Sequence, residues 1–389
     1  MKPVEANIIT NNKYIQTTEF PFERSSKTFY NVPDSPASNY IMETLNAGKD
    51  LDELQTRKLA VTRSTSIEVS GDKKGRQISF TNPDYSVSIQ LADIDKLAGS
   101  NKSVKKLFLL TMIKANEQAL HGGTLTRDHV SFPLQELVDI EFYSSLRSAR
   151  TGFLAGTDVL TDMKIKGQLK HKGKEGGPSV DVLEVLFTGA NITRGQCTIY
   201  LNPRINWGFL SQYYTILPQY YFSLSNRGSE LLYYIFYLAR QNVDKIKHKG
   251  RFNIGFRAIQ QRLMLPSEVG NREPGKTIIR PIEEAVEQIE TLHNKFYGNM
   301  ELQLLPVYDV NANIRDILDH GYLEVTLEGT IADVFINISK DKEKQIKAAR
   351  ERQQKITDAA KEKALINLLE KENARAIEQP AEAQPADGA

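Results

Sequence analysis

The sequence predicts an α+β fold in which one unit of helices and short strands occurs twice in tandem. The first copy runs over Ser103–Pro203 and the second over Ser229–Ser339. Each copy begins with an apolar helix and continues through a short strand, two further helices and closing strands. Apolar positions of the two copies coincide although identity is low, for example Phe153 with Ile282. Repetition of the whole order predicts two domains of one architecture.

Local patterns predict the elements of the first copy and of the strands before it. "TSIEVSG" and "RQISFTN" flank a glycine-containing turn, which is typical of a β-hairpin, and "YSVSIQL" supplies a third strand. The following elements are an apolar helix in "SVKKLFLLTMIKANEQAL", a strand and short helix in "HVSFPLQELVDI", and a longer helix in "YSSLRSARTGFLAGTDVLTDMKIKG". A lysine-rich hairpin over Lys164–Lys174 then leads to the strands "VDVLEVLF" and "CTIYLNP".

The second copy repeats this order. Its elements are an apolar helix in "SELLYYIFYLARQNV", a strand entering a helix in "RFNIGFRAIQQRLML", a helix in "KTIIRPIEEAVEQIETLHNKF", and closing strands in "MELQLLPVYD" and "YLEVTLEGTIADVFINIS". Tyrosines are dense at its start and could stack on bases. Because Tyr233 and Phe236 have helical spacing, core and inter-domain packing is the favoured interpretation.

Composition divides the chain into four segments. Residues 1–64 are polar with few periodic apolar positions, which indicates a flexible, weakly structured N-terminal extension with room for one or two short helices. Residues 65–210 form the first domain with its leading hairpin, and residues 211–340 form the second. Residues 341–389 predict a charged, solvent-exposed helix followed by a disordered tail, with a partner-docking helix as the alternative.

Several classes of protein are disfavoured by composition. No apolar run reaches the length of a membrane-spanning helix, and the first residues lack the apolar segment of a secretory signal, so a cytoplasmic protein is expected. Cys197 is the single cysteine, and the six histidines are scattered without metal-ligand spacing. No metal or other cofactor is therefore expected. The formal net charge is only +2, but basic residues gather locally, as in the five lysines of Lys164–Lys174.

The segment "GNREPGKT", Gly270–Thr277, satisfies the P-loop pattern of nucleotide-binding proteins. A working P-loop needs a buried strand before it and a helix N-terminus directly after it. Here a helical pattern ending at Pro266 precedes the loop, and Pro281 indicates that the following helix begins near Arg280. A basic loop before a helix, suited to a phosphate of DNA, is the favoured interpretation, and a P-loop NTPase is the alternative.

The tandem order of helix, strand, helix, recognition helix and β-hairpin wing resembles the plasmid replication initiators that bind iterons through two winged-helix domains. The segment "HVSFPLQELVDIEFYSSLRSARTGFLAGTDVLTDMKIKG" carries the resemblance most clearly, and the whole likeness covers roughly residues 100–340. It implies that each recognition helix enters a major groove of a repeated origin sequence while the wings contact the backbone. It also implies an origin-binding monomer, a repressing homodimer and recruitment of host replication proteins, without nucleotide hydrolysis.

Twelve residues are predicted to contact double-stranded DNA. Arginine early on a recognition helix can pair with guanine, and lysines on a wing can contact phosphates. The candidates are Ser145, Arg147, Ser148 and Arg150 on the first recognition helix, Lys164, Lys166, Lys170, Lys172 and Lys174 on the wing, and Arg272, Lys276 and Arg280 in the second unit. Neither an enzymatic activity nor a membrane partner is expected. A transcriptional regulator on the same fold remains an open alternative, and a nicking tyrosine is disfavoured by the missing H-x-H motif.

Overall fold

The computed structural model describes residues 29–33, 36–47, 65–72, 75–82, 85–91, 104–115, 117, 129–169, 179–205, 214–267, 269–297, 300–306, 313–329 and 331–337. The chain divides into a large compact body, residues 1–332, and a C-terminal segment, residues 333–389, and the four sheets belong to the large body. The boundary predicted at residues 210/211 therefore lies inside the large body. The tail predicted over 341–389 lies outside the described residues.

The helices and strands form two groups along the chain. The first comprises β1 (Phe29–Pro33), α1 (Pro36–Ala47), β2 (Ser66–Ser70), β3 (Arg76–Asn82), β4 (Tyr85–Leu91), an unlabelled helix over 104–115, β5 (His129–Pro133), α4 (Glu136–Asp139), α5 (Leu146–Asp162), β6 (Met163–Leu169), β7 (Ser179–Val185), β8 (Phe187–Thr193) and β9 (Gln196–Leu201). The second comprises β10 (Tyr214–Pro218), η1 (Gln219–Phe222), α7 (Asn226–Gln241), α8 (Val243–Lys249), β11 (Arg251–Gly255), α9 (Phe256–Arg262), the π-helical turn η2 (Gly275–Ile279), α10 (Arg280–Phe296), β12 (Met300–Leu305), α11 (Ile314–His320) and β13 (Tyr322–Leu327). No helix among the described segments is both long and apolar enough to cross a bilayer.

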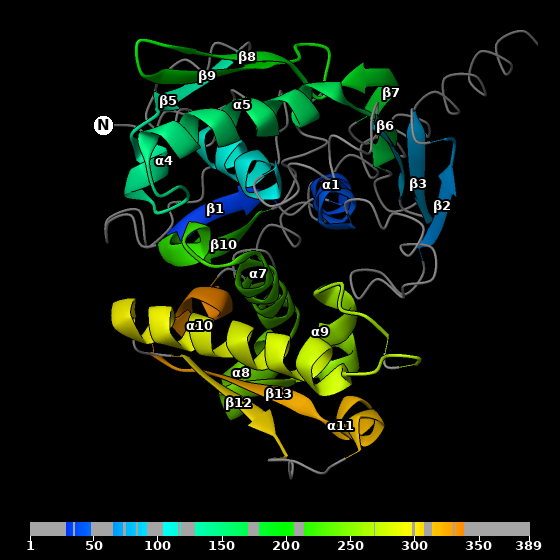
Figure 1. Ribbon diagram of the computed structural model, residues 1–389, viewed down its shortest axis with the longest axis vertical. Coiled ribbons are helices and arrows are strands. Elements are labelled where there is room, and N and C mark those ends of the chain that lie inside the picture. Colours follow the sequence, from blue (N-terminus) through cyan, green and yellow to red (C-terminus); the bar gives the residue numbers. More distant parts are fainter. Residues whose placement is uncertain are drawn as a thin grey trace, which may run out of the picture. The chain divides into compact units, whose positions relative to one another are not determined.

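Two three-stranded antiparallel sheets share one strand order. In the first, whose strands are labelled in Figure 1, β9 lies between β5 and β8. In the second, β13 lies between β11 and β12. In both sheets, the strand that comes first in the chain, β5 or β11, leads directly into two helices. The other two strands of the sheet come later in the chain. The structure is thus a mixed α and β protein in which one strand order occurs twice.

The buried faces of equivalent helices explain their packing. Helix α5 buries Phe153 and Leu160 and contacts β8, while α10 buries Ile282 and Ile289 and contacts α7 and β12. These four side chains are the positions that coincide between the two copies of the sequence pattern. Apolar residues spaced by three, four or seven positions lie on one face of a helix, so both helices bury one stripe and expose the other.

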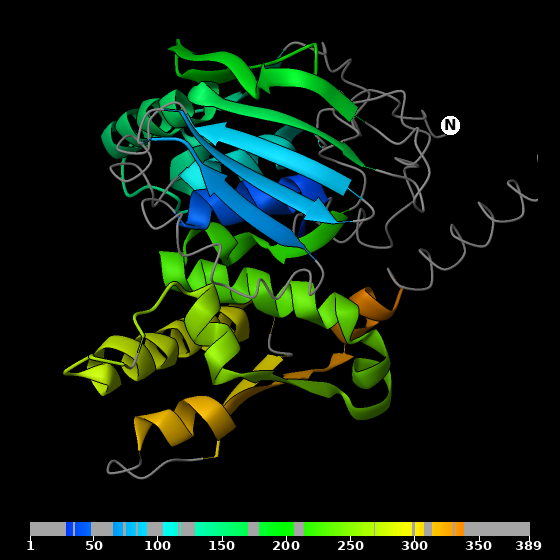
Figure 2. The ribbon, with the colours of Figure 1, turned by 90° about the vertical axis from the view of Figure 1, so that its right-hand side faces the viewer.

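The lysine-rich hairpin does not close the first three-stranded sheet, which corrects the prediction from sequence. Strand β6 pairs with β4 and β7 in a separate five-stranded sheet of order β2-β3-β4-β6-β7, which includes the predicted hairpin and third strand (Figure 2). The register places buried Ile165 opposite buried Ile89. Matching of two apolar alternations decided this pairing, because it buries both strands on one face. The hairpin that belongs with β5 is β8–β9.

The prediction of a weakly structured N-terminal segment over 1–64 is wrong for residues 29–33 and 36–47, the part of this segment that the structure describes. Strand β1 pairs with β10, and α1 is a core helix whose Tyr40 and Ile41 side chains are fully buried. The apolar positions of α1 are few and depend on distant elements for burial, since Tyr40 stacks on Phe80 of β3. Tertiary contacts, which local periodicity does not encode, stabilise this helix.

The tyrosines, the end of α5 and residues 331–337 can also be compared with the predictions from sequence. The dense tyrosines pack in the core as predicted, since Tyr221, Tyr233 and Tyr234 are buried. The long helix ends at Asp162, and residues 163–167, the end of the segment predicted to be helical, belong to strand β6. Residues 331–337 are helical, although the sequence predicts a strand there.

Candidate nucleic-acid interface

The N-terminus of α5 is fixed by a serine pair. Ser145 is the N-cap residue: its hydroxyl oxygen accepts a hydrogen bond from the Ser148 backbone N–H at 3.2 Å, and the Ser148 hydroxyl oxygen accepts one from the Ser145 N–H at 3.1 Å. This reciprocal cap satisfies two N–H groups that the first turn leaves without helical partners. Ser145 and Ser148, both predicted to contact DNA, thus have a structural role that orients the start of the helix.

Arg147 and Arg150 extend from the exposed side of α5. Both side chains are exposed, while Ala149 between them is buried. Neither guanidinium pairs with a carboxylate of any described residue. The first turn of α5 holds no acidic residue either. Cations near a helix N-terminus are unfavourable for the helix itself, because its dipole is positive there. Two unpaired arginines at this end therefore form a site that an external anion would stabilise.

The turn of the β8–β9 hairpin adds a basic residue that the sequence reasoning missed. Arg194 and Gly195 form the turn with φ of 52° and 78°, and the Arg194 side chain is exposed. The Gly195 carbonyl accepts a hydrogen bond from the Leu134 N–H at 2.8 Å, which holds the turn against the segment between β5 and α4. Two residues with positive φ are typical of a tight hairpin turn. The letters "TRGQ" between two alternating strands were the available signal.

The lysines predicted to lie on a wing do not belong to the three-stranded sheet of β5, β8 and β9. Lys164 and Lys166 lie on β6, where Lys166 is exposed and Lys164 is half-buried. Lys170, Lys172 and Lys174 lie outside the described residues. The two described lysines flank buried Ile165, as expected for alternating side chains of a strand with one solvated face.

The P-loop-like segment of the second unit has a different structure from a nucleotide-binding loop. The element before it is helix α9, as the sequence predicts, and none of the described residues between Arg262 and Gly270 is in a strand. The Thr277 hydroxyl donates to the Glu273 carbonyl at 3.0 Å and accepts from the Asn271 side-chain amide at 2.6 Å. Helix α10 begins at Arg280 as predicted, but the π-helical turn η2 precedes it without a break, so helical backbone does reach the loop.

The basic residues of this second helix end are exposed, and two of them pair with neighbouring acids. Lys276 lies 3.4 Å from the Glu273 carboxylate, and the Arg280 guanidinium donates to Glu284 at 2.8 Å. Arg272 is exposed in the loop. Exposed pairs of this kind contribute little to stability and are easily exchanged for another anion.

The exposed face of α10 is acidic from its first turn onward. Glu283, Glu284 and Glu287 are all exposed, and the sequence reasoning did not weigh them. On the buried side, the Tyr220 hydroxyl lies 2.7 Å from His293 Nδ1. Burial lowers the pKa of His293 to about 4, so the imidazole is neutral at pH 7.

A buried network of charges joins α1, the helix over 104–115, α7 and α9. Glu230 of α7 pairs with Lys105 and with Arg262, and Arg262 also pairs with Glu43 of α1. All four side chains are at most 9% exposed. Removing one member of such a network leaves an uncompensated charge in the interior, which is costly.

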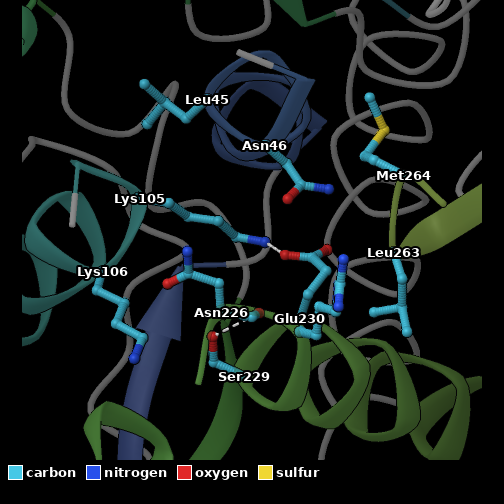
Figure 3. Close-up of a pocket in the computed structure, with 10 residues that line it drawn as sticks. Leu45, Asn46, Lys105, Lys106, Asn226, Ser229, Glu230, Leu263 and Met264 are labelled. Atoms are coloured by element: carbon cyan, nitrogen blue, oxygen red, sulfur yellow. Dashed lines mark hydrogen bonds and ion pairs between the residues drawn. The ribbon is translucent and has the colours of Figure 1, made fainter. Parts of the chain in front are cut away.

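In the small pocket beside this network, the ammonium groups of the two buried lysines already have protein partners. In Figure 3 the Lys105 ammonium points to Glu230. Lys106 donates to the carbonyls of Phe222 and Leu224 at 2.9 and 2.6 Å. Burial lowers the pKa of Lys106 to about 8. These partners give the pocket a structural role in joining helix 104–115 to α7.

Comparisons with known proteins give little beyond this geometry. No family model matches the chain, and no curated protein matches it. Two solved structures are similar in part. RctB domains 2-3 are 9% identical, with a TM-score of 0.37 over 70% of this chain and 94% of that one. A second structure of RctB domains 2 and 3 is 10% identical, with a TM-score of 0.37 over 68% and 92%. These scores are too low to establish a common fold.

Proposed function

We propose that this chain is a sequence-specific double-stranded DNA-binding protein and that α5 is its principal recognition helix. The observation that carries the proposal is the pair Arg147 and Arg150, exposed at a capped helix N-terminus without a described carboxylate partner. Arginine in this position suits a guanine edge or a backbone phosphate in the major groove. The shared strand order supports an interpretation of both units as winged helices, with β8–β9 as the first wing and Arg194 at its tip.

The proposed biological role is replication initiation at repeated origin sequences of a plasmid or other mobile element. It rests on the resemblance of the tandem sequence pattern to iteron-binding initiators. Two recognition units in one chain suit a site that contains two half-sites. A homodimer and contacts with host replication proteins belong to the same proposal. A transcriptional regulator differs in its target, and short direct repeats beside the coding region would favour the initiator.

The proposed role includes no nucleotide hydrolysis. The Thr277 hydroxyl, which would have to reach a metal ion in a P-loop, bonds within its own turn. The helix before Gly270 supports the same interpretation, because a P-loop is delivered by a strand.

The proposal is tested by binding to a pool of random-sequence DNA duplexes. The intact protein should enrich a defined sequence, and Arg147→Ala and Arg150→Ala should each weaken binding to it roughly 10- to 100-fold, since a good arginine–guanine pair contributes about 1–3 kcal/mol. Arg315→Ala, which removes an exposed arginine of α11, is the matched control and should leave the affinity unchanged. Failure to enrich any sequence, or equal binding by all three variants, would overturn the proposal.

A further inference from the structure

The exposed face of α5 is amphipathic in a way that the two arginines do not explain. Leu146 is 49% exposed and Leu154 is 43% exposed, and Thr151 between them is also exposed. Residues 147, 151 and 154 are spaced by four and three positions, so they form one stripe along the helix. Single exposed leucines are common. Here, however, Leu154 lies one turn beyond Arg150, on the face proposed to meet DNA.

Two glycines lie on the side of α5 opposite this face. A Cβ atom on Gly152 would lie 2.3 Å from the Tyr143 ring, and one on Gly156 would lie 2.8 Å from Leu107 Cδ2. Both distances are shorter than real Cβ contacts, so a larger residue at either position would displace the Tyr143 or the Leu107 side chain. The helix therefore packs closely on this side, and the stripe with Leu154 lies on the side that faces outward.

The equivalent helix of the second unit lacks this stripe. With Phe153 matched to Ile282, Leu154 corresponds to Glu283 and Thr151 to Arg280. The apolar character is thus a property of α5 and not of the shared architecture.

We infer that Thr151 and Leu154 read the C5 methyl group of a thymine that lies beside the guanine contacted by Arg147 or Arg150. This inference rests on the proposed function of α5. In the major groove, thymine is the base that presents a methyl group, and an aliphatic side chain is its complement. One helical turn advances ~5.4 Å, which spans one to two base pairs at ~3.4 Å each. The target is therefore a duplex with thymine within two base pairs of a specified guanine.

Uracil provides the test, because it differs from thymine only by the missing methyl group. A duplex enriched from the random pool is remade with uracil replacing each thymine in turn, and affinity for the intact protein is measured. One replacement near the specified guanine should weaken binding about 4-fold, the value for roughly 0.8 kcal/mol per buried carbon group. Leu154→Ala should abolish this difference, whereas Leu154→Met, which keeps an apolar chain, should retain it.

The outcomes separate the inference from the function on which it rests. If no uracil replacement near the guanine affects the wild type while Arg150→Ala still weakens binding, the methyl contact is refuted and the DNA-binding function stands. If Leu154→Ala changes the oligomeric state and leaves the sensitivity to uracil intact, the stripe is a protein-docking surface and the inference is wrong. Loss of all sequence preference in the pool would instead refute the proposed function itself.

Discussion

Helices α5 and α10 have equivalent positions and different surfaces. Each has 17 residues, and each follows the strand and short helix of its own three-stranded sheet. Their buried positions match, yet the outward position of Leu154 in α5 is taken by Glu283 in α10. The comparison shows that the fold constrains the inner stripe of such a helix and leaves the outer stripe free to acquire separate roles.

The difference in charge has a direct consequence for DNA. Helix α5 carries two arginines in its first half and no acid before Asp158. Helix α10 exposes Glu283, Glu284 and Glu287 over the corresponding region. A DNA phosphate would be attracted along the start of α5, whereas the corresponding region of α10 presents acidic side chains that would repel it. We therefore expect the two units to contribute unequally to DNA binding.

The largest expected effect is a loss of stability when the buried charge network around Glu230 is broken. Glu230→Gln should lower the free energy of unfolding by about 3–5 kcal/mol, because Lys105 and Arg262 lose a buried carboxylate partner. Urea denaturation followed by circular dichroism measures the change. The matched control is Glu284→Gln, which breaks the exposed pair with Arg280 and should change stability by less than about 1 kcal/mol. Equal losses in the two variants would show that the buried network does not hold the units together.

The stability of the protein should depend on pH through His293 of α10. Because burial keeps His293 neutral with a pKa of about 4, its contribution to stability is complete above the unfolded value of about 6.5 and is lost as the pH falls toward 4. The loss at pH 5 should be about 2 kcal/mol relative to pH 7. In His293→Leu this part of the pH dependence should vanish, although Tyr220 loses its hydrogen-bond partner at every pH. His320→Gln, at an exposed position of α11, should keep the wild-type profile; an unchanged profile in His293→Leu would contradict the assignment.

The third prediction addresses the acidic face of α10. Replacing Glu283, Glu284 and Glu287 together by glutamine should raise affinity for any DNA sequence several-fold at low salt, roughly 1 kcal/mol, with little gain at high salt. Fluorescence anisotropy at two salt concentrations measures it. Glu301→Gln on β12, which is also exposed, serves as a control and should have a smaller effect. An unchanged affinity at low salt would mean that α10 lies away from the DNA.

The smallest effect is expected at the loop that resembles a P-loop. Lys276→Ala should weaken DNA binding uniformly across sequences and lower the slope of log affinity against log salt by about 1. Calorimetry with ATP is the decisive companion measurement. ATP binding by the wild type that is lost in Lys276→Ala, together with unchanged DNA affinity, would contradict the DNA role and favour the nucleotide alternative.

The sequence located most helices and strands of the two units correctly because their apolar residues recur with a helical or strand period. It also placed Arg147 and Arg150 near the start of a helix, because the apolar positions of that helix recur with a helical period. It missed Arg194, whose significance depends on which hairpin completes the sheet. It allowed a short helix in the region of α1 but not the burial of that helix in the core, because Tyr40 gains its burial from β3, which is about forty residues away in the chain.

By itself, the sequence determined the repeated order of elements and the buried stripes of α5 and α10. These are local properties, fixed by side-chain type and backbone period. Only the tertiary structure decided that the lysine-rich strand β6 joins β4, that β8–β9 completes the first three-stranded sheet, and that Glu43, Lys105, Glu230 and Arg262 meet in one network. Strand partners and buried ion pairs depend on residues distant in the chain, and their choice is made by the burial of whole faces at once.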